Sequence, residues 1–172
     1  VRAHFHGKKG YPSLPVFGLA FELPEQVSRF SWYGRGPWES YPDRRAGAGL
    51  GVYESTKKEQ LARYLKPQEC GMHMDTRRLV LETKDGEKLL FEAEKKPFHF
   101  SLLPYSPIEL ETALHREELP AQSHTWAVIA GAIRGVGGND SWGAPVYPEY
   151  EIPGDRDIIF EFSMGFISNH EE

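Results

Sequence analysis

Cysteine is nearly absent from this sequence, since Cys70 is its only thiol. One thiol cannot form a disulfide within the chain and leaves no cysteine cluster for zinc, so we expect no metal site here and a reducing compartment, the cytoplasm. No stretch approaches the roughly 20 consecutive apolar residues of a membrane-spanning helix. The amino end, from Val1 to Gly10, also lacks the apolar core of a signal peptide. These absences predict a chain without a membrane partner.

An excess of positive charge is lacking too. Lys and Arg number 20 against 25 Asp and Glu, which gives a net charge of -5. Because a nucleic-acid site needs a basic surface to meet the phosphate backbone, we expect no nucleic-acid partner. With 172 residues, 40% of them hydrophobic, the chain has enough material for one substantial core, so we predict one domain over residues 1–172. The chain begins at Val1 rather than Met, from which we expect a piece of a longer protein.

Long helical patterns are also missing, and short β-strands take their place. The 17 Gly and 13 Pro divide the sequence into short segments in which apolar residues alternate. Over residues 16–23, alternation puts Phe17, Leu19, Phe21 and Leu23 on one face of a strand. The other strands that we expect are 29–34, 79–83, 89–93, 98–103, 125–133 and 157–166. Many short strands without a long helix predict a sandwich or a barrel.

Turns, helices and loops complete the expected organisation. The Asp85-Gly86 pair between two predicted strands favours a tight hairpin turn. Ser106 followed by Pro107 and Glu109 predicts a capped short helix over residues 107–114, and a second helical segment is expected over 55–65. Residues 35–51 and 135–148 form long glycine-rich segments that we expect to be irregular. Loops of that length in compact domains often carry function.

The most unusual segment is residues 135–143, where three glycines in four residues permit positive φ angles. Asn139 and Asp140 can bond back to their own backbone to hold a turn. A phosphate cradle is disfavoured because no Lys-Ser/Thr pair and no helix follow the glycines. Trp142 could present its ring to the less polar face of a sugar while neighbouring Asn, Asp or Glu residues bind hydroxyls. Composition alone favours the alternative, in which Trp142 folds back over the end of the sandwich.

Residues 32–45 are dense in aromatics, arginines and acids around glycines. They could build a binding wall, but we favour a structural loop in which Asp43 pairs with Arg44 or another neighbour. A glycosidase needs two carboxylates, about 5 to 5.5 Å apart for a retaining enzyme. Glu39 and Glu69 are possible members of such a pair, although no spacing argument supports them.

Residues 66–77 bring a thiol and an imidazole close together in sequence. Cys70 and His73 suggest a nucleophile and its base, but catalytic pairs normally join distant segments across a cleft. A lone cysteine that is buried as a small hydrophobe is far more common. We therefore expect no cysteine nucleophile.

Several motifs in fixed order resemble the final domain of family 2 β-galactosidases. They include the run from Tyr33 to Pro37, Pro67-Gln68-Glu69, and the run from Gly135 to Trp142, and the match extends from about Leu14 to Phe162. The resemblance implies an all-β fold, an antiparallel β-sandwich that is the later half of a galactose mutarotase-like supersandwich. It also implies that both catalytic glutamates, with a Mg2+ site and a monovalent cation, lie in a separate (β/α)8 TIM barrel. This chain would then hold no catalytic residue and bind no cofactor.

The resemblance also assigns the sugar contact. Trp142 matches the aromatic that lines the galactose pocket in that family, with Asp140 and Asn139 positioning its loop. Asn139 stands where the family usually has an Asp, Cys70 where Asn or Ser is common, and Trp38 where His or Gln is frequent. The implied function is hydrolysis of terminal β-D-galactose from lactose and related β-galactosides by a homo-oligomeric enzyme, with this chain inactive alone. The alternatives are a stand-alone carbohydrate-binding module and a purely structural or assembly domain.

Overall fold

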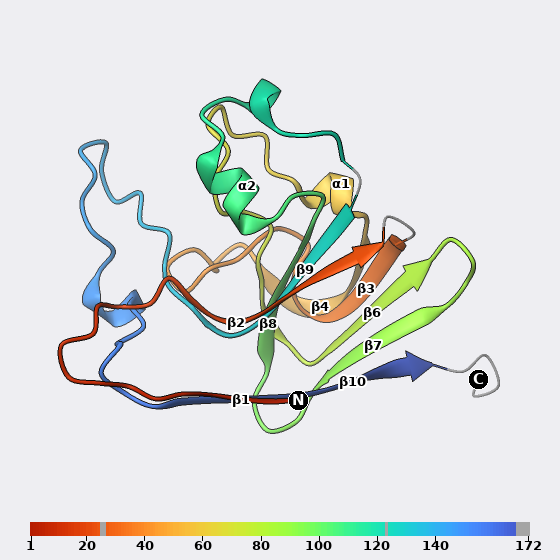
Figure 1. The fold of residues 1–172 in the computed structure, drawn as a ribbon, viewed down its shortest axis with the longest axis horizontal. Coiled ribbons are helices and arrows are strands. Elements are labelled where there is room, and N and C mark those ends of the chain that lie inside the picture. Colours follow the sequence, from red (N-terminus) through yellow and green to blue (C-terminus); the bar gives the residue numbers. More distant parts are fainter. Residues whose placement is uncertain (25–26, 123, 168–172) are drawn as a thin grey trace.

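Two antiparallel sheets pack face to face in the computed structural model, which describes residues 1–24, 27–122 and 124–167 (Figure 1). The strands are β1 (Arg2–Phe5), β2 (Val16–Pro24), β3 (Val27–Gly36), β4 (Gly49–Ser55), β5 (His73–Thr76), β6 (Arg78–Thr83), β7 (Lys88–Ala93), β8 (Phe98–Leu103), β9 (His124–Ile133) and β10 (Ile158–Ile167). One sheet has the order β1-β10-β7-β6-β3-β4 and the other β2-β9-β8-β5. The predicted all-β antiparallel sandwich is confirmed.

All seven strands predicted from alternation are present, as β2, β3, β6, β7, β8, β9 and β10. Three others, β1, β4 and β5, were not predicted. Residues 35–51, expected to be irregular, belong partly to strands, because β3 runs to Gly36 and β4 begins at Gly49. Gly36 pairs with Gly49, so β3 and β4 stay paired up to the loop, residues 37–48, that connects them.

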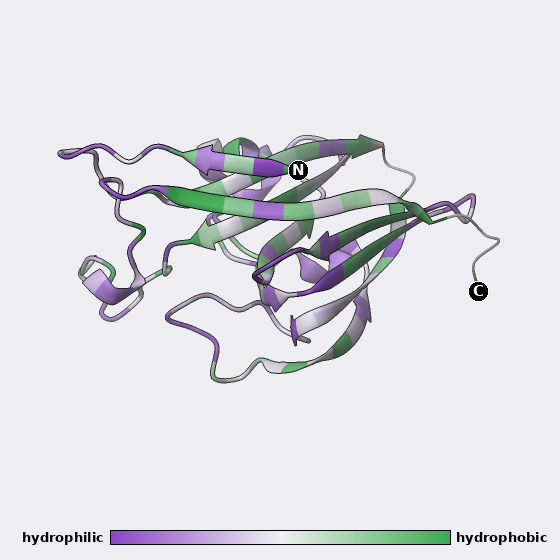
Figure 2. Cartoon of the chain, turned by 90° about the horizontal axis from the view of Figure 1, so that it is seen from below, coloured by the Kyte–Doolittle hydropathy of each residue, from purple (hydrophilic) through white to green (hydrophobic). Residues whose placement is uncertain are grey.

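Buried aromatic rings fill the space between the two sheets. The ring centroids of Phe30 and Trp32 lie 5.5 Å apart in a stacked pair, and Phe100 packs edge-on against Phe30 at 5.8 Å. Such offset and edge-to-face contacts are the arrangements that aromatic rings prefer. The alternating residues of β2 pack against this core as expected; they are Phe17, Leu19, Phe21 and Leu23. Figure 2 shows hydrophobic and hydrophilic residues alternating along the strands.

The predicted hairpin and the capped helix are both present. Gly86 adopts a φ of 84° and donates its N–H to the carbonyl of Thr83 at 3.1 Å, which closes the turn between β6 and β7. In α2 (Pro107–Thr112), the hydroxyl of Ser106 accepts the N–H of Glu109 at 3.1 Å, and the Glu109 carboxylate accepts the N–H of Ser106 at 2.7 Å. These two bonds form the expected capping box.

Both helical segments are shorter than predicted. α2 ends at Thr112 because Ala113 is extended, and α1 (Lys57–Gln60) is a single turn because Leu61 leaves the helical conformation. Leu61 instead packs with its neighbours against the buried Cys70 and Leu103. Two 3-10 turns, η1 (Arg116–Glu118) and η2 (Pro148–Tyr150), complete the elements. Within the described ranges, no helix has the length and apolar character needed to cross a membrane.

Candidate functional site

Two loops that are distant in sequence meet through one carboxylate. Asp43, between β3 and β4, accepts the backbone N–H of Val136 at 3.1 Å and of Gly137 at 2.7 Å, between β9 and β10. A Cβ atom at Gly135 would lie 2.5 Å from Oδ2 of Asp43, so this approach requires glycine. Asp43 therefore has a structural role, as we favoured, but it joins the two loops instead of pairing with Arg44 or another neighbour.

The glycine-rich loop has the backbone that its sequence predicts. Gly137, Gly138 and Gly143 have φ angles of 70°, 82° and 81°. Oδ1 of Asp140 accepts the N–H of Trp142 at 2.8 Å and of Ala144 at 3.1 Å. These donors, Ala144 first, lower the pKa of the Asp140 carboxyl, so its charged form holds the turn.

The indole of Trp142 projects from this turn into solvent. The residue is 91% exposed, so the alternative in which it folds back over the sandwich end is wrong. Tryptophan is highly buried on average, so an exposed indole is unusual. Its ring face is available for a ligand or for other protein. Asn139 is exposed on the same turn, and its role in positioning the loop stays a prediction.

An open hollow of about 540 Å³ lies on the loop that carries Asp43. Its lining consists of Trp38, Glu39, Asp43, Arg44, Arg45, Ala46, Gly47 and Ala48. Trp38 is 74% exposed, so this loop offers a second aromatic surface. Asp43 both lines the hollow and accepts the N–H of Gly137, so it connects the hollow to the glycine-rich loop.

Glu39, one of the residues that line the hollow, also bonds to other segments of the chain. Its Oε1 accepts a hydrogen bond from the hydroxyl of Tyr64 at 2.8 Å and pairs with Arg44, while its Oε2 accepts the N–H of Gly71 at 2.7 Å. One carboxylate thus connects three segments of the chain. These contacts give Glu39 a structural use.

Glu69 is held by a buried phenol. The hydroxyl of Tyr41, a residue with no exposed surface, donates to Oε1 of Glu69 at 3.2 Å. Glu69 is exposed as a residue, but its carboxyl reaches inward to this contact, and burial there raises its pKa to about 7. The hydrogen bond from Tyr41 lowers the pKa and opposes this effect only in part.

Removing the charge at Glu69 is expected to stabilise the protein at alkaline pH. Because the folded-state pKa is raised, the carboxyl favours folding when protonated, and this contribution is lost as pH rises through about 7. We expect the free energy of unfolding of Glu69→Gln to exceed that of wild type by about 1 kcal/mol at pH 8 and by little at pH 4. The value is modest because solvent screens the exposed part of the Glu69 side chain. Urea unfolding at both pH values measures this, and an equal effect at both would contradict it.

Cys70 and His73 do not form a nucleophile and base. Cys70 packs with Leu103 and Leu110, and burial raises the pKa of its thiol to about 12. His73 is fully buried, which lowers its pKa to about 4, and its Nε2 lies 2.9 Å from Oε1 of Gln60. Neutral groups in these surroundings serve packing, as expected for a lone buried cysteine.

Comparison of the sequence with known proteins shows the family of the chain. The family model described as the beta galactosidase small chain matches residues 1–164. The chain belongs to the beta-galactosidase small-chain family. Its relatives include the beta-galactosidase small subunit of Latilactobacillus sakei, which is 45% identical over 96% of this chain and 55% of that protein. The beta-galactosidases of Halalkalibacterium halodurans and Streptococcus thermophilus are 37% and 43% identical over 95% and 87% of this chain.

The chain spans about half the length of the first of these relatives and much less of the others. The share covered is 55% of the Latilactobacillus sakei protein, 16% of the Halalkalibacterium halodurans protein and 15% of the Streptococcus thermophilus protein. The family assignment agrees with the resemblance seen in the motifs, which include the loop that carries Trp142.

The sequence did not predict that Asp43 would join the two loops by accepting the N–H groups of Val136 and Gly137. Replacing it by Asn substitutes an amide for one acceptor oxygen, so one of the two loop N–H groups should lose its partner. We expect Asp43→Asn to reduce the free energy of unfolding by about 1 to 2 kcal/mol. Hydrogen exchange at the Val136 and Gly137 amides should also accelerate. Asp155→Asn, at an exposed carboxylate 3.8 Å from Arg156, is the matched control and should leave both amides unchanged.

Proposed function

We propose that this chain completes the sugar pocket of a β-galactosidase whose catalytic carboxylates belong to a separate TIM barrel. The observation that carries the proposal is the exposed indole of Trp142 on a turn held by Asp140. An aromatic ring packs well against the less polar C–H face of a sugar, while polar groups bind the hydroxyls. The names of the relatives support the activity, and the match of Trp142 to the family's sugar contact supports the role.

In the assembled enzyme, meaning this chain with its barrel, two barrel carboxylates would hydrolyse terminal β-D-galactose from lactose and related β-galactosides. A retaining mechanism uses one as acid and base and the other as nucleophile, through a covalent galactosyl intermediate. The chain's own part is to orient the ring of Trp142 against the sugar, which favours catalysis where contact is better in the transition state. Mg2+ and a monovalent cation would supply charge stabilisation from the barrel, outside this chain.

Exposed apolar side chains on the six-stranded sheet favour the view that a larger partner covers this surface. Val52 on β4 and Phe166 on β10 are 75% and 77% exposed, and surfaces of this kind are commonly covered by other protein. We assign these surfaces to contacts with the rest of a homo-oligomeric, cytoplasmic enzyme. The two sheets would then form the later half of a galactose mutarotase-like supersandwich.

The isolated 172-residue chain provides the test of this division of labour. We expect it to release no product from lactose or from an aryl β-galactoside, and to show no saturable heat when titrated with galactose. The reason is that one indole and an open hollow leave most of a sugar's surface in water. Saturable binding at millimolar or lower concentration would instead support a stand-alone carbohydrate-binding module, and hydrolysis by the chain alone would contradict the proposal.

A further inference from the structure

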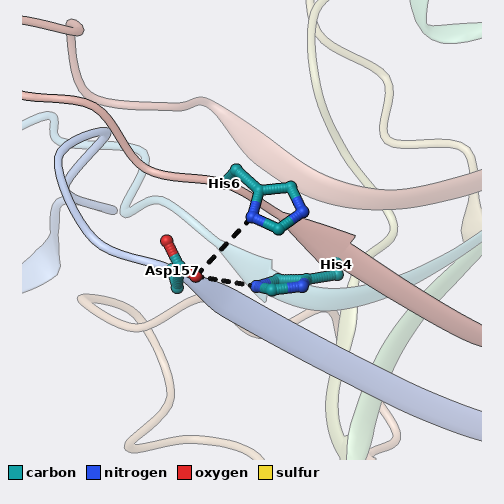
Figure 3. A group of neighbouring side chains, drawn as sticks. All are labelled: His4, His6 and Asp157. Carbon is teal, nitrogen blue, oxygen red and sulfur yellow. Dashed lines mark hydrogen bonds and ion pairs between the residues drawn. The ribbon is translucent and has the colours of Figure 1, made fainter.

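Two histidines and an aspartate converge at the edge of the six-stranded sheet, outside the loops described above. His4 and His6 flank Phe5 at the end of β1, and alternate residues of a strand point to the same face (Figure 3). Phe5 pairs with Ile158, so Asp157 comes from the segment just ahead of the partner strand β10. One ligand atom from each of the three side chains lies within 4.8 Å of the others.

The distances between these atoms are close to those of a metal site. Oδ2 of Asp157 lies 2.9 Å from Nε2 of His4 and 3.7 Å from Nδ1 of His6. Ligands at about 2.0 to 2.1 Å from a tetrahedral zinc ion are separated from one another by about 3.3 Å, between these two values. Small side-chain rotations would therefore suffice to place all three atoms around one ion.

The surroundings hold the carboxylate and leave the site accessible. Oδ1 of Asp157 accepts the N–H of Gly7 at 3.0 Å, a contact that orients the carboxylate while Oδ2 faces the imidazoles. Such an outer contact is what orients ligands in metal sites. All three side chains are exposed, so an ion can enter and water can fill its remaining position.

The donor set decides which ion fits. Two imidazole nitrogens and one carboxylate oxygen suit Zn2+ and neighbouring divalent transition ions, whereas Mg2+ prefers an octahedron of oxygen ligands. A neutral imidazole offers one nitrogen lone pair to a metal ion, and a carboxylate offers an oxygen. An ion pair with Asp157 needs only one histidine, and His4 supplies it. A second histidine nevertheless lies beside the first, because the ring centroid of His6 is 3.8 Å from that of His4.

We propose that His4, His6 and Asp157 form a site for Zn2+ or a similar divalent transition ion that links β1 to β10. This differs from the expectation, based on the lack of cysteines, that the chain has no metal site. β1 lies at the end of its sheet and pairs with β10 alone among the described strands, so the ion would strengthen the attachment of the first strand. The inference is independent of the proposed sugar contact.

The test is a titration of the chelator-treated, dialysed chain with Co2+ at pH 7.5, followed by displacement with Zn2+. We expect visible absorption from one bound Co2+ per chain, lost on addition of Zn2+, and a higher unfolding temperature with Zn2+. Because loss of an outer contact to a metal ligand already costs 10- to 100-fold in affinity, His6→Gln should weaken binding at least about 10-fold. Asp157→Asn should do the same, and shared unfolding temperatures in chelator would show that the variants are folded.

The matched control is His115→Gln. His115 is also exposed and lies 2.8 Å from a carboxylate oxygen, that of Glu118, but the described residues supply no third ligand atom there. This variant should bind Co2+ like the wild type. Failure of the wild-type chain to bind Co2+ or Zn2+, or equal binding by His6→Gln and wild type, would overturn the proposal. Because the readout is metal binding, the result does not depend on sugar hydrolysis by the assembled enzyme.

Discussion

Replacing Trp142 by Ala is expected to lower kcat/KM of the assembled β-galactosidase about 5- to 150-fold. This range corresponds to about 1 to 3 kcal/mol of transition-state binding, which is typical for removal of a desolvated aromatic contact. Trp142 is exposed in this chain, so its truncation leaves the sandwich core intact. Steady-state kinetics with lactose and with an aryl β-galactoside measure the effect, because the galactose part is common to both substrates.

Two further variants separate a sugar contact from a general loss of folding. Trp142→Phe keeps a ring on the turn and should retain more activity than Trp142→Ala. Leu65→Ala truncates a side chain that is 93% exposed and lies outside both loops, and it should leave the kinetics unchanged. Unchanged kinetics of Trp142→Ala for both substrates would refute the assignment.

Acid should destabilise the protein through His73. Its folded-state pKa, lowered by burial to about 4, lies below the unfolded value, so neutral His73 favours folding above pH 6.5. This contribution, about 3 kcal/mol, is lost as pH falls from about 6.5 through about 4, because the unfolded chain takes up the proton first. Urea unfolding at a series of pH values should show a shallower decline in His73→Gln than in wild type.

The comparison with the variant is needed because Glu69 acts in the opposite direction over an overlapping range. Protonation of Glu69 favours folding, so it offsets part of the loss in wild type and in His73→Gln alike. His124→Gln, at an exposed histidine 2.8 Å from Glu22, is the control and should keep the wild-type decline. A decline in His73→Gln as steep as in the control would show that His73 is not buried in its neutral form.

Alternation predicted the strands that carry the core but not the strands with other patterns. β4 places Leu50 and Val52 on the exposed side, and glycines occupy positions 49 and 51, so Tyr53 is the one large apolar side chain of this strand that packs against the core. β5 has only four residues and pairs with β8 through His73 and Thr76. Neither strand carries the periodic signal from which strands are recognised.

The candidate site divides in the same way between local and distant information. The positive φ angles of Gly137 and Gly138 and the turn around Asp140 follow from local sequence. The exposure of Trp142 does not, since composition favoured a buried ring and only the resemblance favoured a sugar contact. Asp43 contacts residues 93 and 94 positions away, and no local pattern predicts such a pair. The unmet N–H groups of the glycine run were the one signal that some acceptor had to be nearby.

Hydroxyl-radical footprinting of Trp142 tests the central claim most directly. The rate of indole oxidation, read by mass spectrometry of the peptide, is compared in the isolated chain, in the assembled enzyme, and in the assembled enzyme with a slowly hydrolysed galactoside. We expect fast oxidation in the isolated chain, where Trp142 is 91% exposed, slower oxidation after assembly, and the slowest with galactoside. Leu65 should show no change on addition of the galactoside. Oxidation of Trp142 as fast in the galactoside-bound enzyme as in the isolated chain would contradict the account.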